Sequence, residues 1–201
     1  MYIQVIQGRC NNADRLREQL DLWEQTLADG ADGWLGTTGG VTDDGTFVAV
    51  ARFDSREQAD ANSARPEQDA WWRETSTCFD GEAGFTDYDD AFTWLGGGSD
   101  DAGFVQVMRG RVADADGFRT FSQQPMEGLS EMRPEIIGGT VAVADDGDFT
   151  QTIYFTSEAE AREGEKKEMP EEVQREMGQA MGDMSDIAYL DLRDPWFSGR
   201  A

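Results

Sequence analysis

The sequence contains no histidine and only two cysteines, Cys10 and Cys78, among its 201 residues. Histidine is the commonest metal ligand and acid–base side chain at neutral pH. Its absence excludes histidine-containing zinc sites, histidine-ligated haem and Ser-His-Asp or Cys-His catalysis. Two cysteines are too few for a disulfide framework, and we interpret them as small buried hydrophobic residues. We therefore expect no metal and no cofactor, and no catalytic residue can be assigned from composition.

Basic residues are also scarce. The chain has 41 Asp and Glu against 17 Lys and Arg, which gives a formal net charge of −24. Such an acidic protein repels phosphate backbones and anionic lipid headgroups, so we expect neither a nucleic-acid nor a membrane partner. The sequence has no apolar run long enough to span a bilayer and opens on an alternating strand pattern rather than a basic, apolar leader. We expect a cytoplasmic protein whose partner is a small molecule.

The chain does contain an internal duplication. The stretch VTDDGTF at 41–47 returns as VADDGDF at 143–149, displaced by 102 residues. An Asp-Asp-Gly between two apolar runs is typical of a tight hairpin, because Asp and Gly tolerate the backbone angles of such turns. At the same offset, residues 2–61 match residues 104–163 at 18 of 60 positions, where unrelated stretches would match at about four. We infer a tandem duplication.

Each copy predicts the same order of elements. In the first, residues 2–9 alternate as a strand, and a helix with one apolar stripe follows from an asparagine cap to Gly30. A hairpin is centred on the DDG turn, and Ser55 is positioned to cap a second helix that we expect to reach about Phe79. The segment FTDYDD at 85–90 closes the unit as a last strand. The order βαββαβ is that of a ferredoxin-like unit, with two helices on one face of an antiparallel sheet.

The second copy repeats this order with two differences. Pro125 falls in its first helix and is expected to bend or break it. Its second helix is expected to carry an apolar stripe of Val173, Met177, Met181 and Met184. Beyond that helix we expect the offset of 102 to return, with Asp89 matching Asp191 and Trp94 matching Trp196.

These patterns predict an α+β fold built from two ferredoxin-like βαββαβ repeats. We place the repeats at residues 1–94 and 104–197, a linker at 95–103 and a tail at 198–201. The segment TFVAVARF is apolar on both faces, so each sheet needs cover on both sides. We therefore expect the two repeats to pack sheet to sheet as a single-chain, pseudo-dimeric α/β barrel. It is expected to be monomeric in solution, with a higher assembly left open as the alternative.

Residues 45–73 also carry a resemblance to a known family. A glycine at the end of the first strand, the DDG hairpin and a second helix that opens as FDSREQADANSARPEQDAWWRE resemble the dimeric α/β barrel superfamily. The resemblance is strongest to antibiotic biosynthesis monooxygenase-type domains, here in tandem. It implies a small-molecule pocket between sheet and helices. Some members oxygenate phenolic polyketides without metal or flavin, whereas others degrade haem, dismutate chlorite or have no known activity.

Four side chains of the first copy are candidates for ligand binding. Asn62 lies where some of these monooxygenases place a polar pocket residue, and Trp71, Trp72 and Arg52 can add stacking faces and hydrogen-bond donors. For the tryptophans, plain core packing is the alternative. In the second copy Gly164 matches Asn62, so we expect any such pocket in the first copy.

Arg9 and Arg111 follow matching glycines and give each copy a cation at the end of its first strand. Each can anchor an anionic ligand or form a salt bridge with an acidic neighbour. Two functions stay open at this point. One is a fused barrel that binds a small apolar or aromatic molecule without catalysis, and the other is a cofactor-independent monooxygenase acting on an aromatic or phenolic metabolite.

Overall fold

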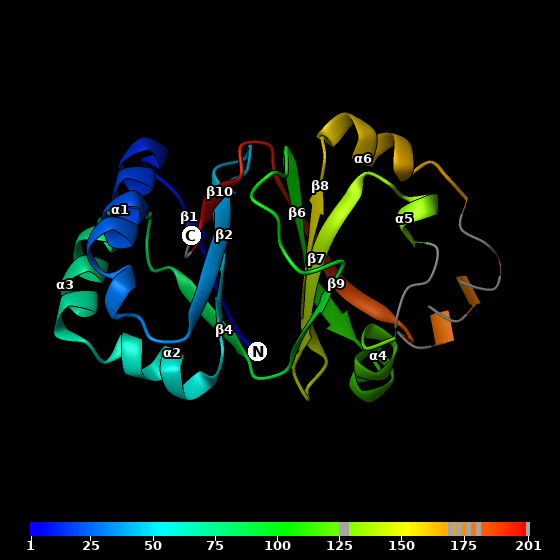
Figure 1. Cartoon of the computed structure of the whole chain (residues 1–201), viewed down its shortest axis with the longest axis horizontal. Helices are drawn as coiled ribbons and strands as arrows, with labels where there is room; N and C mark the ends of the chain where they lie inside the picture. The colour runs from blue at the N-terminus through cyan, green and yellow to red at the C-terminus, as the bar shows by residue number, and fades with distance from the viewer. Residues whose placement is uncertain (125–128, 169–170, 172–173, 176–177, 180–181, 200–201) are drawn as a thin grey trace. The chain divides into compact units, whose positions relative to one another are not determined.

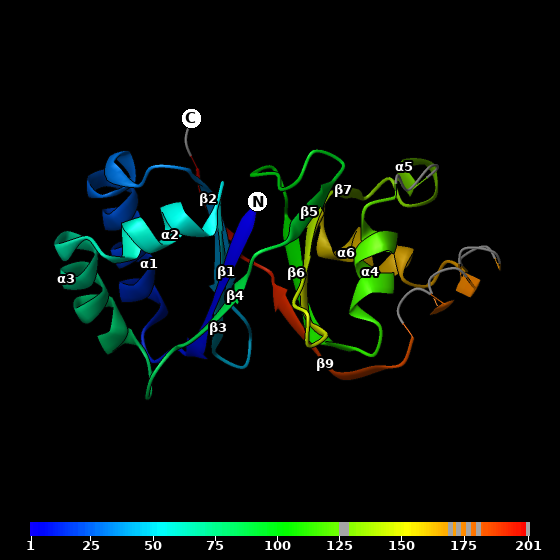
Figure 2. The same ribbon diagram turned by 90° about the horizontal axis from the view of Figure 1, so that it is seen from below.

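The computed structural model describes the chain except for residues 125–128, 169–170, 172–173, 176–177, 180–181 and 200–201. It divides into two compact units: unit 1 comprises residues 1–89 and 194–201, and unit 2 comprises residues 90–193. Each unit holds a five-stranded antiparallel sheet. Helices cover one face of each sheet, as Figures 1 and 2 show. This confirms the α+β class and the presence of two ferredoxin-like repeats in a single chain. Within the described residues, no helix is both long and apolar enough to cross a membrane.

The sheet of unit 1 has the strand order β10-β2-β3-β1-β4. Its strands are β1 (Tyr2–Arg9), β2 (Trp34–Val41), β3 (Thr46–Phe53), β4 (Gly84–Tyr88) and β10 (Trp196–Ser198). The helices that cover it are α1 (Ala13–Thr26), α2 (Arg56–Ser63) and α3 (Pro66–Thr75), with short 3-10 turns at Ala28–Gly30 and Ser76–Cys78. The central strand β3 is buried on both faces, as its apolar pattern predicts: Phe47 and Ala49 on one face and Val48 and Val50 on the other are at most 2% exposed.

The helix starts of unit 1 follow from their capping residues. The side chain of Asn12 accepts a hydrogen bond from the Arg15 backbone N–H at 3.1 Å, and that of Ser55 accepts one from Gln58 at 3.3 Å. The expectation of one continuous helix from Ser55 to Phe79 is wrong. Pro66 opens a separate helix at its first turn and forces the preceding residue, Arg65, into an extended conformation.

Unit 2 repeats this plan with the strand order β5-β7-β8-β6-β9. Its elements are β5 (Ala91–Trp94), β6 (Phe104–Val112), α4 (Ala115–Ser122), α5 (Leu129–Met132), β7 (Ile136–Val143), β8 (Asp148–Phe155), α6 (Glu158–Gly164) and β9 (Met184–Leu192). Met184 is not helical as expected, because it pairs with Val112 in the β6–β9 ladder. Pro125, Val173, Met177 and Met181 lie outside the described residues, and α4 ends before Pro125 is reached.

The two sheets exchange their last strands. β5 follows β4 in the chain but pairs with β7 in unit 2, and β10 follows β9 but pairs with β2 in unit 1. The compact units therefore differ from the sequence repeats by one short strand each. An arginine on the first helix of each unit contacts the incoming segment: Arg17 lies 3.3 Å from Asp194, and Arg119 lies 3.6 Å from Asp90.

The register of the last strands corrects the expected matches. Gln4 pairs with Asp87 and Gln106 pairs with Asp191, so these aspartates are equivalent at an offset of 104 rather than 102. The expected match of Asp89 with Asp191 is therefore wrong by two residues. The same holds for Trp94 and Trp196, because Trp196 pairs with Gly39 and its counterpart on β5 is Phe92, which pairs with Val141. Asp87 follows Phe53 by 34 positions and Asp191 follows Phe155 by 36, so the second copy is two residues longer between these equivalent positions.

Candidate functional site

Unit 1 contains a cavity between its sheet and the three helices. The cavity measures about 110 Å³, taken as the space open to the centres of water-sized molecules. This is several times what a single water needs, so the site has room for a small organic molecule. The strands β1, β2, β3 and β10 form its floor, and α1, α2 and α3 form its roof; the aromatic lining residues are Trp23, Trp34, Phe47, Phe53, Trp71, Trp72, Phe79, Trp196 and Phe197.

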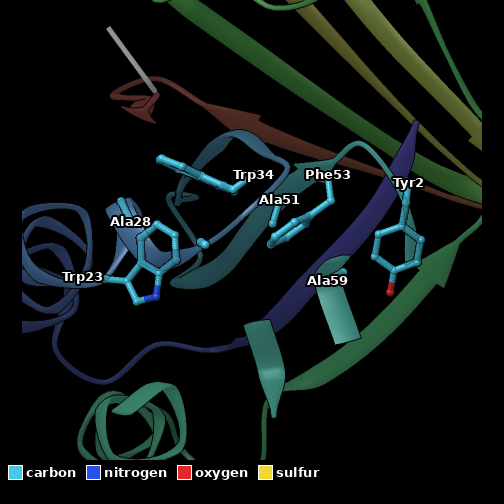
Figure 3. Close-up of a cluster of buried hydrophobic side chains, with 8 residues drawn as sticks. Tyr2, Trp23, Ala28, Trp34, Ala51, Phe53 and Ala59 are labelled. Atoms are coloured by element: carbon cyan, nitrogen blue, oxygen red, sulfur yellow. The ribbon is translucent and has the colours of Figure 1, made fainter. Parts of the chain in front are cut away.

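Tryptophan rings form much of the wall. Trp23 and Trp34 meet edge to face with ring centroids 4.8 Å apart, and Trp71 lies 5.9 Å from Trp72. Figure 3 shows Trp23 and Trp34 lying together, with Ala51 and Phe53 of β3 further along the same cluster. Flat apolar walls of this kind favour an aromatic ligand, because ring faces and edges attract each other at these distances.

The indole N–H groups of three of these rings are held by the protein. Trp23 Nε1 donates to Gln68 Oε1 at 2.6 Å, Trp34 Nε1 to Thr37 Oγ1 at 3.0 Å and Trp71 Nε1 to the backbone carbonyl of Gln19 at 2.8 Å. These rings are fixed in place, and their donors are already used. They serve the cavity as walls rather than as hydrogen-bonding groups.

Asn62 is a buried polar residue of the wall, with 7% of its surface exposed. Its Oδ1 accepts a hydrogen bond from Arg65 Nη1 at 3.0 Å. A guanidinium group can only donate, so this contact fixes the amide with its oxygen toward Arg65 and its Nδ2 group on the other side. Arg65 is itself held by the carbonyl of Leu27 and by Glu67, each at 3.0 Å. The hydrogen bonds of the described residues leave Asn62 Nδ2 as a donor for whatever occupies the cavity.

The structure brings together three of the six predicted site residues. Asn62, Trp71 and Trp72 all line the cavity. Arg52 does not, because side chains alternate along β3 and its neighbours Ala51 and Phe53 take the cavity face. The Arg52 guanidinium instead lies 3.5 Å from Thr38 Oγ1.

Arg9 and Arg111 lie at the DDG turns, away from the cavity lining. The guanidinium of Arg9 lies beside Gly45 of the first turn. Arg111 donates to the backbone carbonyl of Asp146 at 2.7 Å and to its carboxylate at 3.2 Å. For Arg111 the structure therefore supports the salt bridge over the ligand anchor.

Sequence reasoning missed the part of the wall that comes from the end of the chain. Trp196, Phe197 and Ser198 of β10 line the cavity. Trp196 packs against Phe47 with ring centroids 6.1 Å apart, and the guanidinium carbon of Arg17 lies 5.5 Å from its ring centre. The aromatic pair at 196–197 is visible in the sequence. The offset of 102 matched Trp196 with Trp94, however, whereas its structural counterpart is Phe92.

Charged groups lie at the margin of the cavity. Arg17 and Asp21 of α1 are exposed lining residues, so the cavity opens to solvent beside this helix. Outside the lining, Asp87 of the sheet accepts hydrogen bonds from Tyr2 Oη at 2.5 Å and from Nε2 of the lining residue Gln4 at 3.0 Å. Burial, together with the Asp87 carboxylate, raises the pKa of Tyr2 well above its usual value, so this phenol stays protonated and cannot act as a base at neutral pH. In the described part of the chain, no three Cys, Asp or Glu side chains are grouped to hold a metal ion.

The position in unit 2 that is equivalent to Asn62 is surrounded by different side chains. Gly164 stands at the position of Asn62, and a side chain there would overlap the carboxylate of Glu135. Glu135 is 6% exposed and forms ion pairs with Arg133 and, at 3.9 Å, with Lys167. Burial raises the pKa of Glu135, but the Arg133 hydrogen bond and the two cations outweigh it, and the pKa lies below its ordinary value. A paired carboxylate therefore fills the corner that Asn62 occupies in unit 1.

No family model and no curated protein matches the sequence. Among solved structures, a candidate monooxygenase from Lactobacillus acidophilus NCFM matches with a TM-score of 0.73 at 12% identity, covering 98% of this chain and 95% of that one. An anthrone oxidase-like protein matches with a TM-score of 0.60 at 10% identity, covering 99% and 94%. The chain has the fold of monooxygenase-like proteins.

A monooxygenase-like protein from Listeria innocua extends the same comparison, with a TM-score of 0.51 at 13% identity, covering 99% of this chain and 94% of that one. Each match spans both repeats. The monooxygenase-like fold that the resemblance implied is thus confirmed. Identities this low establish the fold alone.

Proposed function

We propose that the cavity of unit 1 binds a small, flat aromatic molecule that carries an oxygen acceptor. The observation that carries this proposal is the Asn62 amide, buried in a tryptophan-lined wall and turned by Arg65 so that its Nδ2 group is the free end. Polar groups are buried at a cost unless a partner satisfies them, and a ligand oxygen is such a partner. The aromatic walls supply the affinity, and the amide supplies the orientation.

The size of the cavity fits this ligand class. A two-ring aromatic group buries up to about 250 Å² of surface, which is worth roughly 6 kcal/mol of transfer free energy before the costs of association. The rings of the wall are already held by Gln68, Thr37 and the Gln19 carbonyl, so little side-chain freedom is lost on binding. A preorganised pocket keeps more of the transfer free energy as affinity.

A second candidate function is cofactor-independent oxygenation of a phenolic ligand in the same cavity. The monooxygenase-like fold favours it. In such a reaction an electron-rich phenolic substrate reduces dioxygen. One oxygen atom enters the substrate as a carbonyl oxygen, and the other leaves as water with the two hydrogen atoms that the substrate loses. The Asn62 amide can stabilise the phenolate oxygen. Tyr2 is not a base, and Asp21 is exposed at the margin, so the substrate must ionise readily by itself.

Two measurements test these functions in order. Titration with 2-naphthol, followed by calorimetry, should show saturable binding that Asn62→Ala weakens about tenfold, the value of one hydrogen bond. Asn11→Ala, which changes an exposed asparagine near Asp80, is the matched control and should bind as the unmodified protein does. No saturable binding to the unmodified protein would refute the binding function.

Oxygen uptake then separates binding from catalysis. An oxygen electrode should record uptake with anthrone-like or naphthol-like phenols if the monooxygenase function holds, and Asn62→Ala should abolish it without unfolding the protein. Saturable binding without oxygen uptake would support the binding function and refute the monooxygenase function.

A further inference from the structure

The cavity of unit 1 is completed by a strand that belongs to the second repeat. β10 comes from the end of the chain, after all the elements of unit 2, and pairs with β2 through Trp196, Phe197 and Ser198. All three residues line the cavity. The first repeat alone, residues 1–94, therefore lacks part of its own binding site.

Trp196 differs from Trp23, Trp34 and Trp71 in one respect. Its Nε1 is buried and has no hydrogen-bond partner among the described residues. Trp23, Trp34 and Trp71 donate to protein oxygens at 2.6 to 3.0 Å. An unsatisfied buried N–H costs about 1–3 kcal/mol, and an acceptor oxygen brought to Nε1 by an occupant of the cavity would remove that cost.

The ring of Trp196 is held so that this donor has a fixed place. Phe47 packs against it, and Arg17 lies over it at 5.5 Å from the ring centre. The strand is secured at both ends, because Arg17 pairs with Asp194 and the Gly199 backbone N–H donates to Glu24 at 3.3 Å. A donor that is fixed before binding loses little entropy when it meets an acceptor.

The equivalent strand of unit 2 lacks this donor. The register places Phe92 of β5 at the position of Trp196, and phenylalanine has no N–H. The corner filled by Asn62 in unit 1 is likewise filled by Glu135 in unit 2. Two polar features that distinguish unit 1 from unit 2 thus lie in the same cavity.

We propose that Trp196 is a specificity-determining residue of this cavity, whose Nε1–H donates to a carbonyl or phenolate oxygen of the bound aromatic molecule. This assignment rests on the ligand-binding function proposed above. The exchanged strand then serves recognition as well as folding, since the second repeat supplies the donor for the site of the first.

The test uses a pair of ligands that differ only in the acceptor. 1-Tetralone carries a ketone on a two-ring frame, and tetralin is the same frame without the oxygen. Equilibrium dialysis gives the affinity of the full-length protein and of Trp196→Phe for each. The substitution introduces the residue type that β5 carries at the equivalent position. Trp94→Phe, on the exchanged strand of unit 2, is the matched control.

The readout is the ratio of the two affinities, because lost packing lowers both equally and a lost hydrogen bond lowers only that for tetralone. We expect the unmodified protein and Trp94→Phe to prefer tetralone, and Trp196→Phe to lose about five- to tenfold of that preference. An unchanged ratio in Trp196→Phe, with binding retained, would overturn the role of Trp196 and leave the cavity as a ligand site. If neither compound binds the unmodified protein, the binding function fails and this assignment fails with it.

A second measurement does not depend on the variant. In the unmodified protein labelled with ¹⁵N, the assigned indole resonance of Trp196 should move downfield with tetralone and stay in place with tetralin. Equal responses to the two compounds would count against the hydrogen bond even if Trp196→Phe did not fold.

Discussion

Arg65→Met tests whether the Asn62 amide is held as the contacts indicate. The substitution keeps most of the apolar stem of the side chain and removes the guanidinium. Two of its hydrogen bonds are partly buried, to Asn62 Oδ1 and to the Leu27 carbonyl at the end of α1, each at 3.0 Å. The third, to Glu67, involves a carboxylate that is half exposed and is worth little.

The expected loss follows from these contacts. A hydrogen bond to a charged group contributes about 1.5–3 kcal/mol, and the Arg65 side chain is 19% exposed, so we take the lower end for each of the two bonds. The free energy of unfolding of unit 1 should fall by about 2–4 kcal/mol. Arg73→Met on the same helix is the matched control. Its pair with Asp69 is on the surface, and its loss should cost at most about 0.5 kcal/mol.

Urea unfolding followed by tryptophan fluorescence is a suitable assay. Five of the six tryptophans lie in unit 1, and Trp94 alone lies in unit 2, so the signal reports mainly on unit 1. In an Asn62→Ala background the cost of Arg65→Met should shrink by about 1–2 kcal/mol, the coupling between the two side chains. Equal losses for Arg65→Met and Arg73→Met, or a coupling near zero, would show that Arg65 does not position the amide.

Three further outcomes are expected. Gly164→Ala should destabilise unit 2 in thermal unfolding, although alanine favours helices by about 1 kcal/mol over glycine, because the added Cβ overlaps the Glu135 carboxylate; a raised melting temperature would contradict the close contact. Because the pKa of Glu135 lies below its ordinary value of about 4.3, its ionised form stabilises the folded state above that pH, and the stabilisation is lost as pH falls through the folded pKa. The difference in urea midpoint between Glu135→Gln and the unmodified protein should therefore shrink below about pH 4. A difference that stays constant with pH would show that the ionised Glu135 carboxylate does not stabilise the folded state. Arg17→Met should speed hydrogen exchange at Phe197 in β10, since it removes the contacts with Trp196 and Asp194; unchanged protection would show that Arg17 does not hold the strand.

Part of the site could be predicted from the sequence because it lies in the helical segment that follows the capping residue Ser55. Asn62, Trp71 and Trp72 belong to the segment after Ser55, and all three line the cavity. Arg52 could not be assigned to a face from its pattern, because TFVAVARF is apolar on both sides and offers no alternation to orient it. The role of Arg65 was hidden for a related reason: Pro66 divides the expected helix at that residue and turns its side chain toward Asn62 and Leu27.

The sequence by itself determined the duplication, the βαββαβ order and the two hairpins, because these depend on local periodicity, capping and turn chemistry that each copy carries within itself. The tertiary structure alone decided where the last strand of each repeat pairs. β5 and β10 contain four and three residues, too few for a pattern to choose between sheets, and their choice is made by free edges of β7 and β2 and by Arg119 and Arg17. That choice places Trp196 in the cavity of unit 1, a contact between residues of the first and second repeats that no local pattern encodes.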